Sequence, residues 1–205
     1  MSITELEKPL ETSRAKRLKT ATNETHERLD KSIMMQKPFE SRERYGQFVQ
    51  VQYLFHREID ALYSNAILDG MLPDLLGRRR FGLIEFDLAD LAIVPPATDR
   101  PPSFDRVTVD IQSALGWLYV AEGSNLGAAF LLKEAAKLGL SETFGARHLA
   151  AAPEGRGLHW KTFTAALDAL QLTEPEETRV IDGARAAFAR VQELVEDLLV
   201  RQTTS

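Results

Sequence analysis

Apolar residues recur at intervals of three and four along most of the chain, and strict alternation of apolar and polar residues is hard to find. Intervals of three and four place side chains on one face of an α-helix, whereas alternation would indicate a β-strand. The clearest example is the first predicted helix, whose inward face carries Leu18, Thr22, His26, Leu29 and Ile33. The pattern therefore predicts an all-α protein.

Proline, glycine and capping residues set the limits of the predicted helices. Long helices are expected over residues 13–34, 41–68, 116–136, 158–170 and 173–200, with shorter helical pieces in 73–77 and 78–91. The last helix begins with Thr173-x-x-Glu176, the pattern of a capping box. Four prolines in residues 94–103 predict a surface loop. No repeat or long linker divides the chain, so we expect one domain over 1–205, with flexible ends at 1–12 and 202–205.

Composition and charge argue against several classes of protein. The 205 residues are 44% hydrophobic and 27% charged, which is typical of a globular domain. A net charge of -5 argues against nucleic-acid binding, which needs a dense basic surface. The lack of cysteine excludes disulfides, thiolate metal sites and cysteine nucleophiles. Without a signal-peptide pattern or an uncharged apolar run of about 18 residues, we expect a cytoplasmic protein that does not bind a membrane.

The most apolar predicted helix contains two glycines, Gly123 and Gly127, with Ser124 between them. Each glycine costs a helix roughly 0.5–1 kcal/mol relative to alanine, so their presence needs a reason. One interpretation is that the small residues let another helix approach closely. The other is that a flat, rigid ligand lies against the bare backbone. The motif G-S-x-L-G lacks the Lys-Ser/Thr pair of a phosphate loop, which disfavours a nucleotide.

His26 lies on the otherwise apolar stripe of the first predicted helix. A single histidine in such a place is commonly a core residue with one hydrogen bond. Neutral imidazole is also the usual axial ligand of heme iron, and one histidine is enough. A helix with one inward-facing histidine and a helix with two glycines on one face would together form the two sides of a heme site. The Glu-x-x-His repeat of di-iron bundles and the G-x-S-x-G motif of serine hydrolases are both missing.

Three segments, in this order and at these separations, resemble a bacterial heme (haem) oxygenase: LKTATNETHERLDKSI, GWLYVAEGSNLGAAFLLK and TFGARHLAAAPEGRGLHWKTF. The resemblance extends from about residue 14 to residue 195. It implies an all-helical fold in which heme b lies between a proximal and a distal helix. It also implies an enzyme that opens the heme ring to biliverdin, carbon monoxide and ferrous iron.

The resemblance assigns roles residue by residue. His26 matches the proximal iron ligand, and Gly123 and Gly127 match distal glycines that make room for the ring and for O₂. Further heme contacts are expected from Lys19, Tyr119, Ser124, Lys161 and Phe188, of which Lys19, Tyr119 and Lys161 would bind the propionates.

Gln52 and His56, one turn apart, match a pair that anchors ordered water on the distal side in some relatives. The other interpretation of such a pair is an exposed helix face. Relatives that cut the ring at unusual positions hold the propionates with a different pair of lysines. The matching positions here are Met34 and Glu134, so biliverdin IXα is the expected product. The arginines of residues 77–80 could dock a reductase, but a solvated charge cluster is the favoured interpretation.

Heme and O₂ are thus the expected ligands, with electrons from an external donor of the ferredoxin or flavin reductase type. Biliverdin could serve a bacterial phytochrome as its chromophore, or its formation could release iron for growth. Two interpretations from other classes stay open: a heme carrier or sensor that leaves the ring intact, and a helical module whose glycine face binds another protein.

Overall fold

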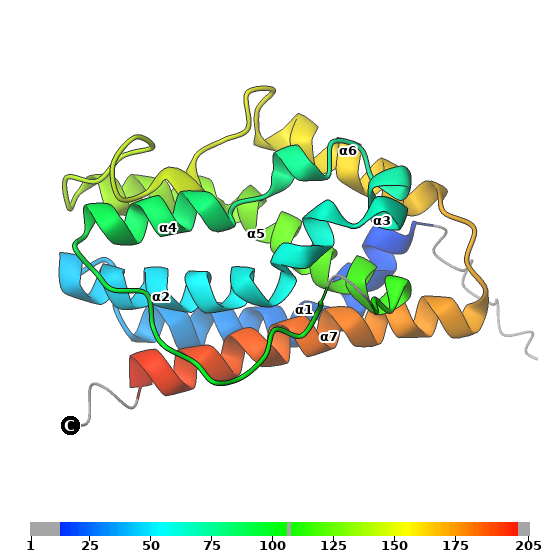
Figure 1. Cartoon of the computed structure of the whole chain (residues 1–205), viewed down its shortest axis with the longest axis horizontal. Coiled ribbons are helices and arrows are strands. Elements are labelled where there is room, and N and C mark those ends of the chain that lie inside the picture. The colour runs from blue at the N-terminus through cyan, green and yellow to red at the C-terminus, as the bar shows by residue number, and fades with distance from the viewer. Residues whose placement is uncertain (1–12, 106–107, 201–205) are drawn as a thin grey trace, which may run out of the picture.

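The computed structural model describes residues 13–105 and 108–200, and within these ranges the chain forms seven α-helices and no strand (Figure 1). The helices are α1 (Arg14–Met35), α2 (Arg42–Ile59), α3 (Ala66–Met71), α4 (Phe81–Asp90), α5 (Ile111–Ala136), α6 (Arg156–Ala169) and α7 (Glu174–Val195). Short 3-10 turns cover Asp60–Ser64, Leu76–Arg78 and Arg147–Leu149, and a π-helical turn, Glu196–Val200, continues α7. The all-α prediction is confirmed. The expected flexible ends, 1–12 and 202–205, lie outside the described residues.

The prediction of one helix over 41–68 was wrong, because α2 ends at Ile59 and α3 starts after Asn65. The side chain of Asn65 accepts hydrogen bonds from the backbone N–H groups of Ile67 and Leu68. An N-cap of this kind satisfies the free N–H groups of a new helix and so favours a break in the chain at this point. The capping box of Thr173 and Glu176 starts α7 as predicted.

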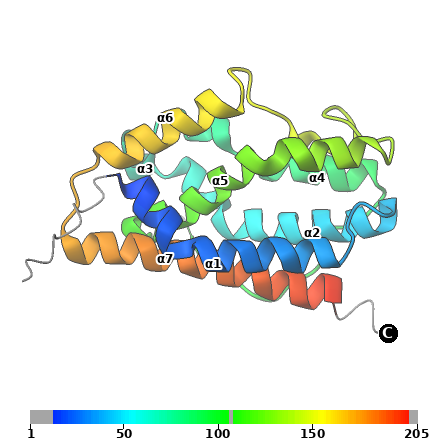
Figure 2. The same cartoon turned by 180° about the vertical axis from the view of Figure 1, so that it is seen from behind.

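The helices are arranged in layers that both views of the molecule show. α1 and α7 run side by side along one edge, α4 and α6 lie toward the opposite edge, and α2 and α5 lie between them (Figures 1 and 2). α5 makes its most extensive contact with α7, and α1 also packs on α7, whereas α1 and α5 touch each other little. Among the described residues, none of the helices combines the length and apolarity that crossing a lipid bilayer requires.

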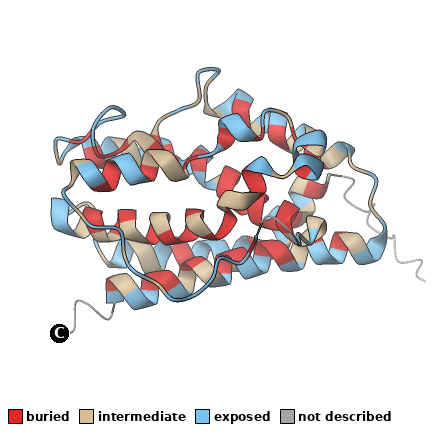
Figure 3. Cartoon of the chain, in the orientation of Figure 1, coloured by how far each residue is buried: buried red, intermediate tan, exposed pale blue. Residues whose placement is uncertain are grey.

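Two clusters of buried apolar side chains form the interior, and α5 contributes to both. Its first half, through Ala121, packs in the larger cluster with α2, α6 and α7. Its second half, from Ala128, packs in a smaller cluster with α2 and α4. Buried residues accordingly lie on the sides of the helices that face one another (Figure 3). The glycine segment, residues 122–127, lies between the parts of α5 that belong to the two clusters.

Two other glycines make a close backbone contact between α5 and α7. A Cβ atom on Gly116 of α5 would lie 2.1 Å from the carbonyl oxygen of Val180, and one on Gly183 of α7 would lie 2.3 Å from that of Ser113. Neither backbone can move away easily, because both helices are packed in the larger cluster. Glycine at these two positions is therefore what lets α5 and α7 touch.

Candidate functional site

Neither glycine of the segment 122–127 is used to pack another helix closely. A Cβ atom on Gly127 would meet no atom within 4 Å, and one on Gly123 would meet only the ring of Trp160, at 3.5 Å. Gly127 is exposed, and its neighbours Leu126 and Phe130 on α5 are 46% and 54% exposed. The helix-packing interpretation therefore does not account for these glycines. The bare backbone and the exposed apolar side chains beside it could instead accommodate a flat apolar ligand.

His26 lies on α1 with 59% of its side-chain surface exposed. Its Nε2 atom is 3.4 Å from the Asp30 carboxylate, one turn away, and its ring centroid is 5.5 Å from that of Phe188 on α7. The interpretation of His26 as a buried core histidine was thus wrong. Leu18 and Leu29 of the same predicted stripe are buried. The imidazole remains accessible to a ligand, and Phe188 provides an apolar surface next to it.

These residues fit a heme. An accessible imidazole nitrogen is the ligand that binds heme iron in many proteins. The missing side chains at Gly123 and Gly127 leave room for the heme ring. The two features are on α1 and α5, helices that both pack on α7 but touch each other little. No atom of His26 lies within 4 Å of a Cβ atom placed on Gly123 or Gly127.

The predicted propionate partners differ in their surroundings. Lys19 and Lys161 are exposed, and within the described part of the chain neither has an ion-pair partner. Tyr119 is buried instead. Its hydroxyl donates to the carbonyl oxygen of Ala15 at 3.4 Å, and burial raises the pKa of this phenol to about 12. Its ring centroid lies 5.5 Å from that of Trp160, so Tyr119 links α1 and α6 beside the glycine segment.

Gln52 is half-buried and His56 is buried, so this pair is not an exposed helix face. Burial, and then the nearby charges of His148 and Arg80, lower the pKa of His56 to about 3. The imidazole is therefore neutral at ordinary pH. Its Nδ1 atom has no hydrogen-bond partner, and the same holds for Nε2 of His148 and Nε of Arg80. Buried polar atoms of this kind usually bind ordered water.

Sequence reasoning missed the roles of His148 and Arg80. The Nδ1 atom of His148 donates to the Asp87 carboxylate at 2.7 Å, and Arg80 donates to the carbonyl oxygens of His148 and Ala150. Since a carboxylate only accepts, the Nδ1 atom of His148 carries a proton. Asp87 lies 61 positions before His148, so no local pattern could have paired them.

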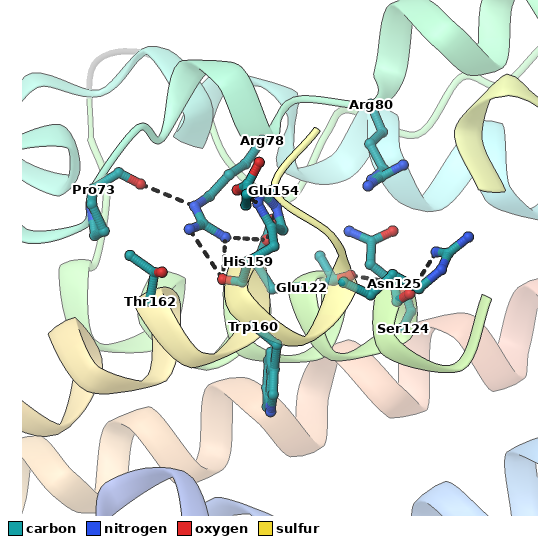
Figure 4. Close-up of polar contacts among 12 residues, drawn as sticks. Pro73, Arg78, Arg80, Glu122, Ser124, Asn125, Glu154, His159, Trp160 and Thr162 are labelled. Carbon is teal, nitrogen blue, oxygen red and sulfur yellow. Dashed lines mark hydrogen bonds and ion pairs between the residues drawn. The ribbon is translucent and has the colours of Figure 1, made fainter. Parts of the chain in front are cut away.

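A second buried polar cluster forms around Glu122, at the start of the glycine segment (Figure 4). The Glu122 carboxylate, on α5 next to Gly123, is 3.0 Å from Nη1 of Arg78. It also accepts from the Tyr63 hydroxyl at 3.4 Å and lies 3.4 Å from Nε2 of His159. This carboxylate, and then that of Glu154, raise the pKa of His159. The cluster fixes the side of α5 that faces away from the exposed glycine.

The expectation of a solvated charge cluster at residues 77–80 was wrong for two of its three arginines. Arg78 and Arg80 are only 3% and 8% exposed. Arg79 is exposed and pairs with Asp60 at 2.6 Å. A run of arginines suggests a solvated surface. In the fold, however, Arg78 donates to the buried Glu122 carboxylate, and Arg80 donates to the carbonyl oxygen of His148.

Known proteins resemble this chain in sequence and in fold. The model of the heme oxygenase family matches residues 12–197. The curated protein Heme oxygenase PigA of Pseudomonas aeruginosa is 45% identical over 183 residues, which are 89% of this chain and 91% of that protein.

Two solved structures are similar over nearly their whole length. The NO- and CO-bound heme oxygenase of Neisseria meningitidis has 41% sequence identity and a TM-score of 0.85, with 92% of each chain covered. Heme oxygenase-1 of the cyanobacterium Synechocystis, in complex with heme, has 16% identity and a TM-score of 0.74, with 94% of this chain and 96% of that chain covered. The second likeness concerns the fold alone.

Proposed function

The chain belongs to the heme oxygenase family, and from this premise we propose that it cleaves heme to biliverdin IXα, carbon monoxide and ferrous iron. As in its family, heme is both the cofactor and the substrate. O₂ and externally supplied electrons complete the reaction. We also propose that residues 1–205 act as one domain.

We assign His26 as the axial ligand of the iron. Its exposed ring can coordinate without unfolding any part of the core, and a contact of 3.4 Å with the exposed Asp30 carboxylate is too weak to compete. The ring of Phe188 would contact the heme on the same side. Bound heme supplies the iron that activates O₂ and the ring carbon that is oxidised.

The observation that carries the proposal is that Gly123 and Gly127 are not needed to pack a helix. Both glycines weaken α5, and neither is required by the close approach of another helix. Their presence is explained if a ligand must approach the helix backbone itself. A side chain at Gly127 would project into open space. We propose that this space receives the distal face of the heme and O₂, with Ser124 beside them.

The propionates would bind Lys19 and Lys161, whose exposed ammonium groups have no competing partner in the described chain. Tyr119 would support this side of the site through its bond to Ala15. The alternative pair of positions holds Met34 and Glu134, and Glu134 would repel a carboxylate. Seating through Lys19 and Lys161 supports the IXα isomer as the product.

On the distal side, we propose that Gln52 and His56 bind ordered water together with Arg80 and His148. Three unpartnered buried atoms, one each from His56, Arg80 and His148, provide the polar contacts that such water needs. A neutral His56 can either donate to water or accept from it. Water held in this way can hydrogen-bond bound O₂ and deliver protons.

The electron donor is proposed to be a ferredoxin or a flavin reductase, since the sequence has no flavin or nicotinamide fingerprint of its own. Release of iron for growth and supply of biliverdin to a bacterial phytochrome both need this reaction. Electron transfer from the donor would occur at the exposed side of the site.

The test is to mix purified protein with hemin and record the Soret band, then add a reductase, NADPH and catalase. We expect a Soret band typical of histidine coordination, followed by its loss and the appearance of biliverdin IXα on chromatography. Gly127→Leu should bind hemin poorly or turn it over slowly. A stable complex without biliverdin would indicate a carrier or sensor, and no hemin uptake would indicate a protein-interaction module. Either result contradicts the proposal.

A further inference from the structure

The first turn of α6 reaches across to the glycine segment of α5 through one arginine. Nη1 of Arg156 donates to the carbonyl oxygen of Asn125 at 2.8 Å, and Nη2 donates to the carbonyl oxygen of Leu149. One guanidinium group therefore joins α5 to the end of the 3-10 turn Arg147–Leu149. Since arginine cannot lose its proton in proteins, this bridge does not depend on pH.

The carbonyl group that Arg156 binds lies between the two glycines. Asn125, labelled in Figure 4, is two residues from each of Gly123 and Gly127. Glycine allows more backbone conformations than other residues, so a helical turn with a glycine at each end has little stiffness of its own. A donor from another helix to this one carbonyl restricts how far the turn can bend.

Apolar packing does not restrain this turn. The larger buried cluster ends at Ala121 and the smaller one starts at Ala128, so the residues between them belong to neither. Glu122, at the start of the turn, is fixed by Arg78. Further along the turn, the bond from Arg156 is a tertiary hydrogen bond to the backbone itself.

We propose that Arg156 is a positioning residue for the heme oxygenase reaction, which holds the Asn125 carbonyl group and so fixes the turn of α5 that faces the heme. The proposal rests on the proposed function, because the position of the turn matters only if Gly123 and Gly127 face the heme. A change of about 1 Å in the position of a group around a reacting centre can lower the rate roughly 100-fold. Loss of the bridge should therefore lower turnover more than heme affinity.

Arg42 offers a matched control. It also donates to two backbone carbonyl oxygens, those of Leu138 and Gly139, but these lie beyond the C-terminal end of α5. The variants are Arg156→Met, which removes every donor, Arg156→Lys, which keeps one charged donor, and Arg42→Met. Circular dichroism and thermal unfolding establish that each variant is folded before it is compared.

The first measurement is amide hydrogen exchange in the heme-free protein. We expect Arg156→Met to speed exchange roughly ten-fold or more at residues 126–130, Arg156→Lys to speed it less, and Arg42→Met to leave it unchanged there. Unchanged exchange in Arg156→Met would overturn the proposal. If Arg156→Met does not fold, the same comparison is made with Arg156→Ala, which also removes every donor, and wild-type exchange in that variant would equally overturn the proposal.

The second measurement uses the heme complex. In Arg156→Met we expect hemin affinity within about two-fold of wild type, turnover lowered roughly 10- to 100-fold, and a shifted or broadened C–O stretch in the ferrous carbon monoxide complex. Arg42→Met should match wild type in all three. A wild-type C–O stretch in Arg156→Met would overturn the role of Arg156. Failure of wild-type protein to bind hemin would instead overturn the proposed function, and the exchange result alone would then decide whether Arg156 holds the turn.

Discussion

Gly116 of α5 packs directly against Gly183 of α7, so that a Cβ atom on Gly116 would lie 2.9 Å from the carbonyl carbon of Gly183. The same Cβ atom would be 2.1 Å from the Val180 carbonyl oxygen. Gly127, on the same helix, has open space in the corresponding place. Two glycines of one helix therefore have different reasons for being glycine, and alanine substitution can separate them.

Gly116→Ala should destabilise the protein, because two packed backbones would have to move apart, at a cost of about 1–3 kcal/mol or more. Gly127→Ala should stabilise the heme-free protein by about 0.5–1 kcal/mol, since alanine favours helix and meets no neighbour. Urea denaturation of both variants measures these changes. If Gly127→Ala is destabilised, the space beside Gly127 is not open, and the assignment of this surface to the heme fails.

His26→Ala should leave the unfolding free energy of the heme-free protein within about 0.5 kcal/mol of wild type, because the side chain is exposed. The same variant should lose the Soret band of histidine-coordinated heme and lose turnover. Added imidazole should restore part of the band by occupying the vacated coordination position. A wild-type hemin spectrum in His26→Ala would show that another group binds the iron.

Acid should destabilise the protein through His56. The unfolded chain protonates this histidine near its ordinary pKa of 6.5, whereas the folded protein keeps it neutral down to about pH 3. Stability from this group is therefore complete above pH 6.5 and is lost as the pH falls, by about 1.4 kcal/mol at about pH 5.5. Chemical denaturation of wild type and His56→Gln between pH 8 and 5 measures the effect.

In this comparison, His56→Gln should lose about 1.4 kcal/mol less than wild type between about pH 8 and pH 5.5, whatever its stability at pH 8. His159 contributes in the opposite sense, because its pKa is raised, but it is common to both proteins and cancels in the difference. Parallel stability curves for the two proteins would show that His56 is accessible to water in the folded state.

The buried ion pair of Arg78 and Glu122 should show strong coupling. Both side chains are almost fully buried, at 2% and 1% exposure, so removal of either partner leaves an unpaired charge in the interior. Arg78→Met or Glu122→Gln alone should cost about 3–5 kcal/mol, and the double variant should cost clearly less than the sum. A double-mutant cycle on unfolding free energies tests this. Additive costs would mean that water screens the pair.

The sequence was sufficient for features that depend on local patterns. The interval of apolar residues predicted the all-α fold, and Thr173 with Glu176 predicted the start of α7, because a capping box acts within one turn. The break at Asn65 was missed, since the same apolar spacing continues on both sides of it. The Asn65 side chain, by capping α3, starts a new helix there although the apolar pattern predicts that one helix continues.

The candidate site was predictable only in part, for the same reason. The glycines and His26 stand out because each is unexpected on its own helix. The burial of Arg78 and its pairing with Glu122 join residues 44 positions apart, and a run of arginines normally indicates a solvated surface. Contacts of this kind depend on how the helices pack, which no short stretch of the sequence encodes.

The membership of α5 in two separate apolar clusters has a consequence for how this enzyme could be altered. Each half of the helix is anchored by its own set of neighbours, so a bulkier residue at a position such as Ala135 would displace one half relative to the other. The displacement would be absorbed where the backbone is most pliable, around Gly123 and Gly127. If the heme binds at this segment as proposed, a substitution such as one at Ala135 should change turnover by tilting one half of the helix, without changing any residue proposed to contact the heme.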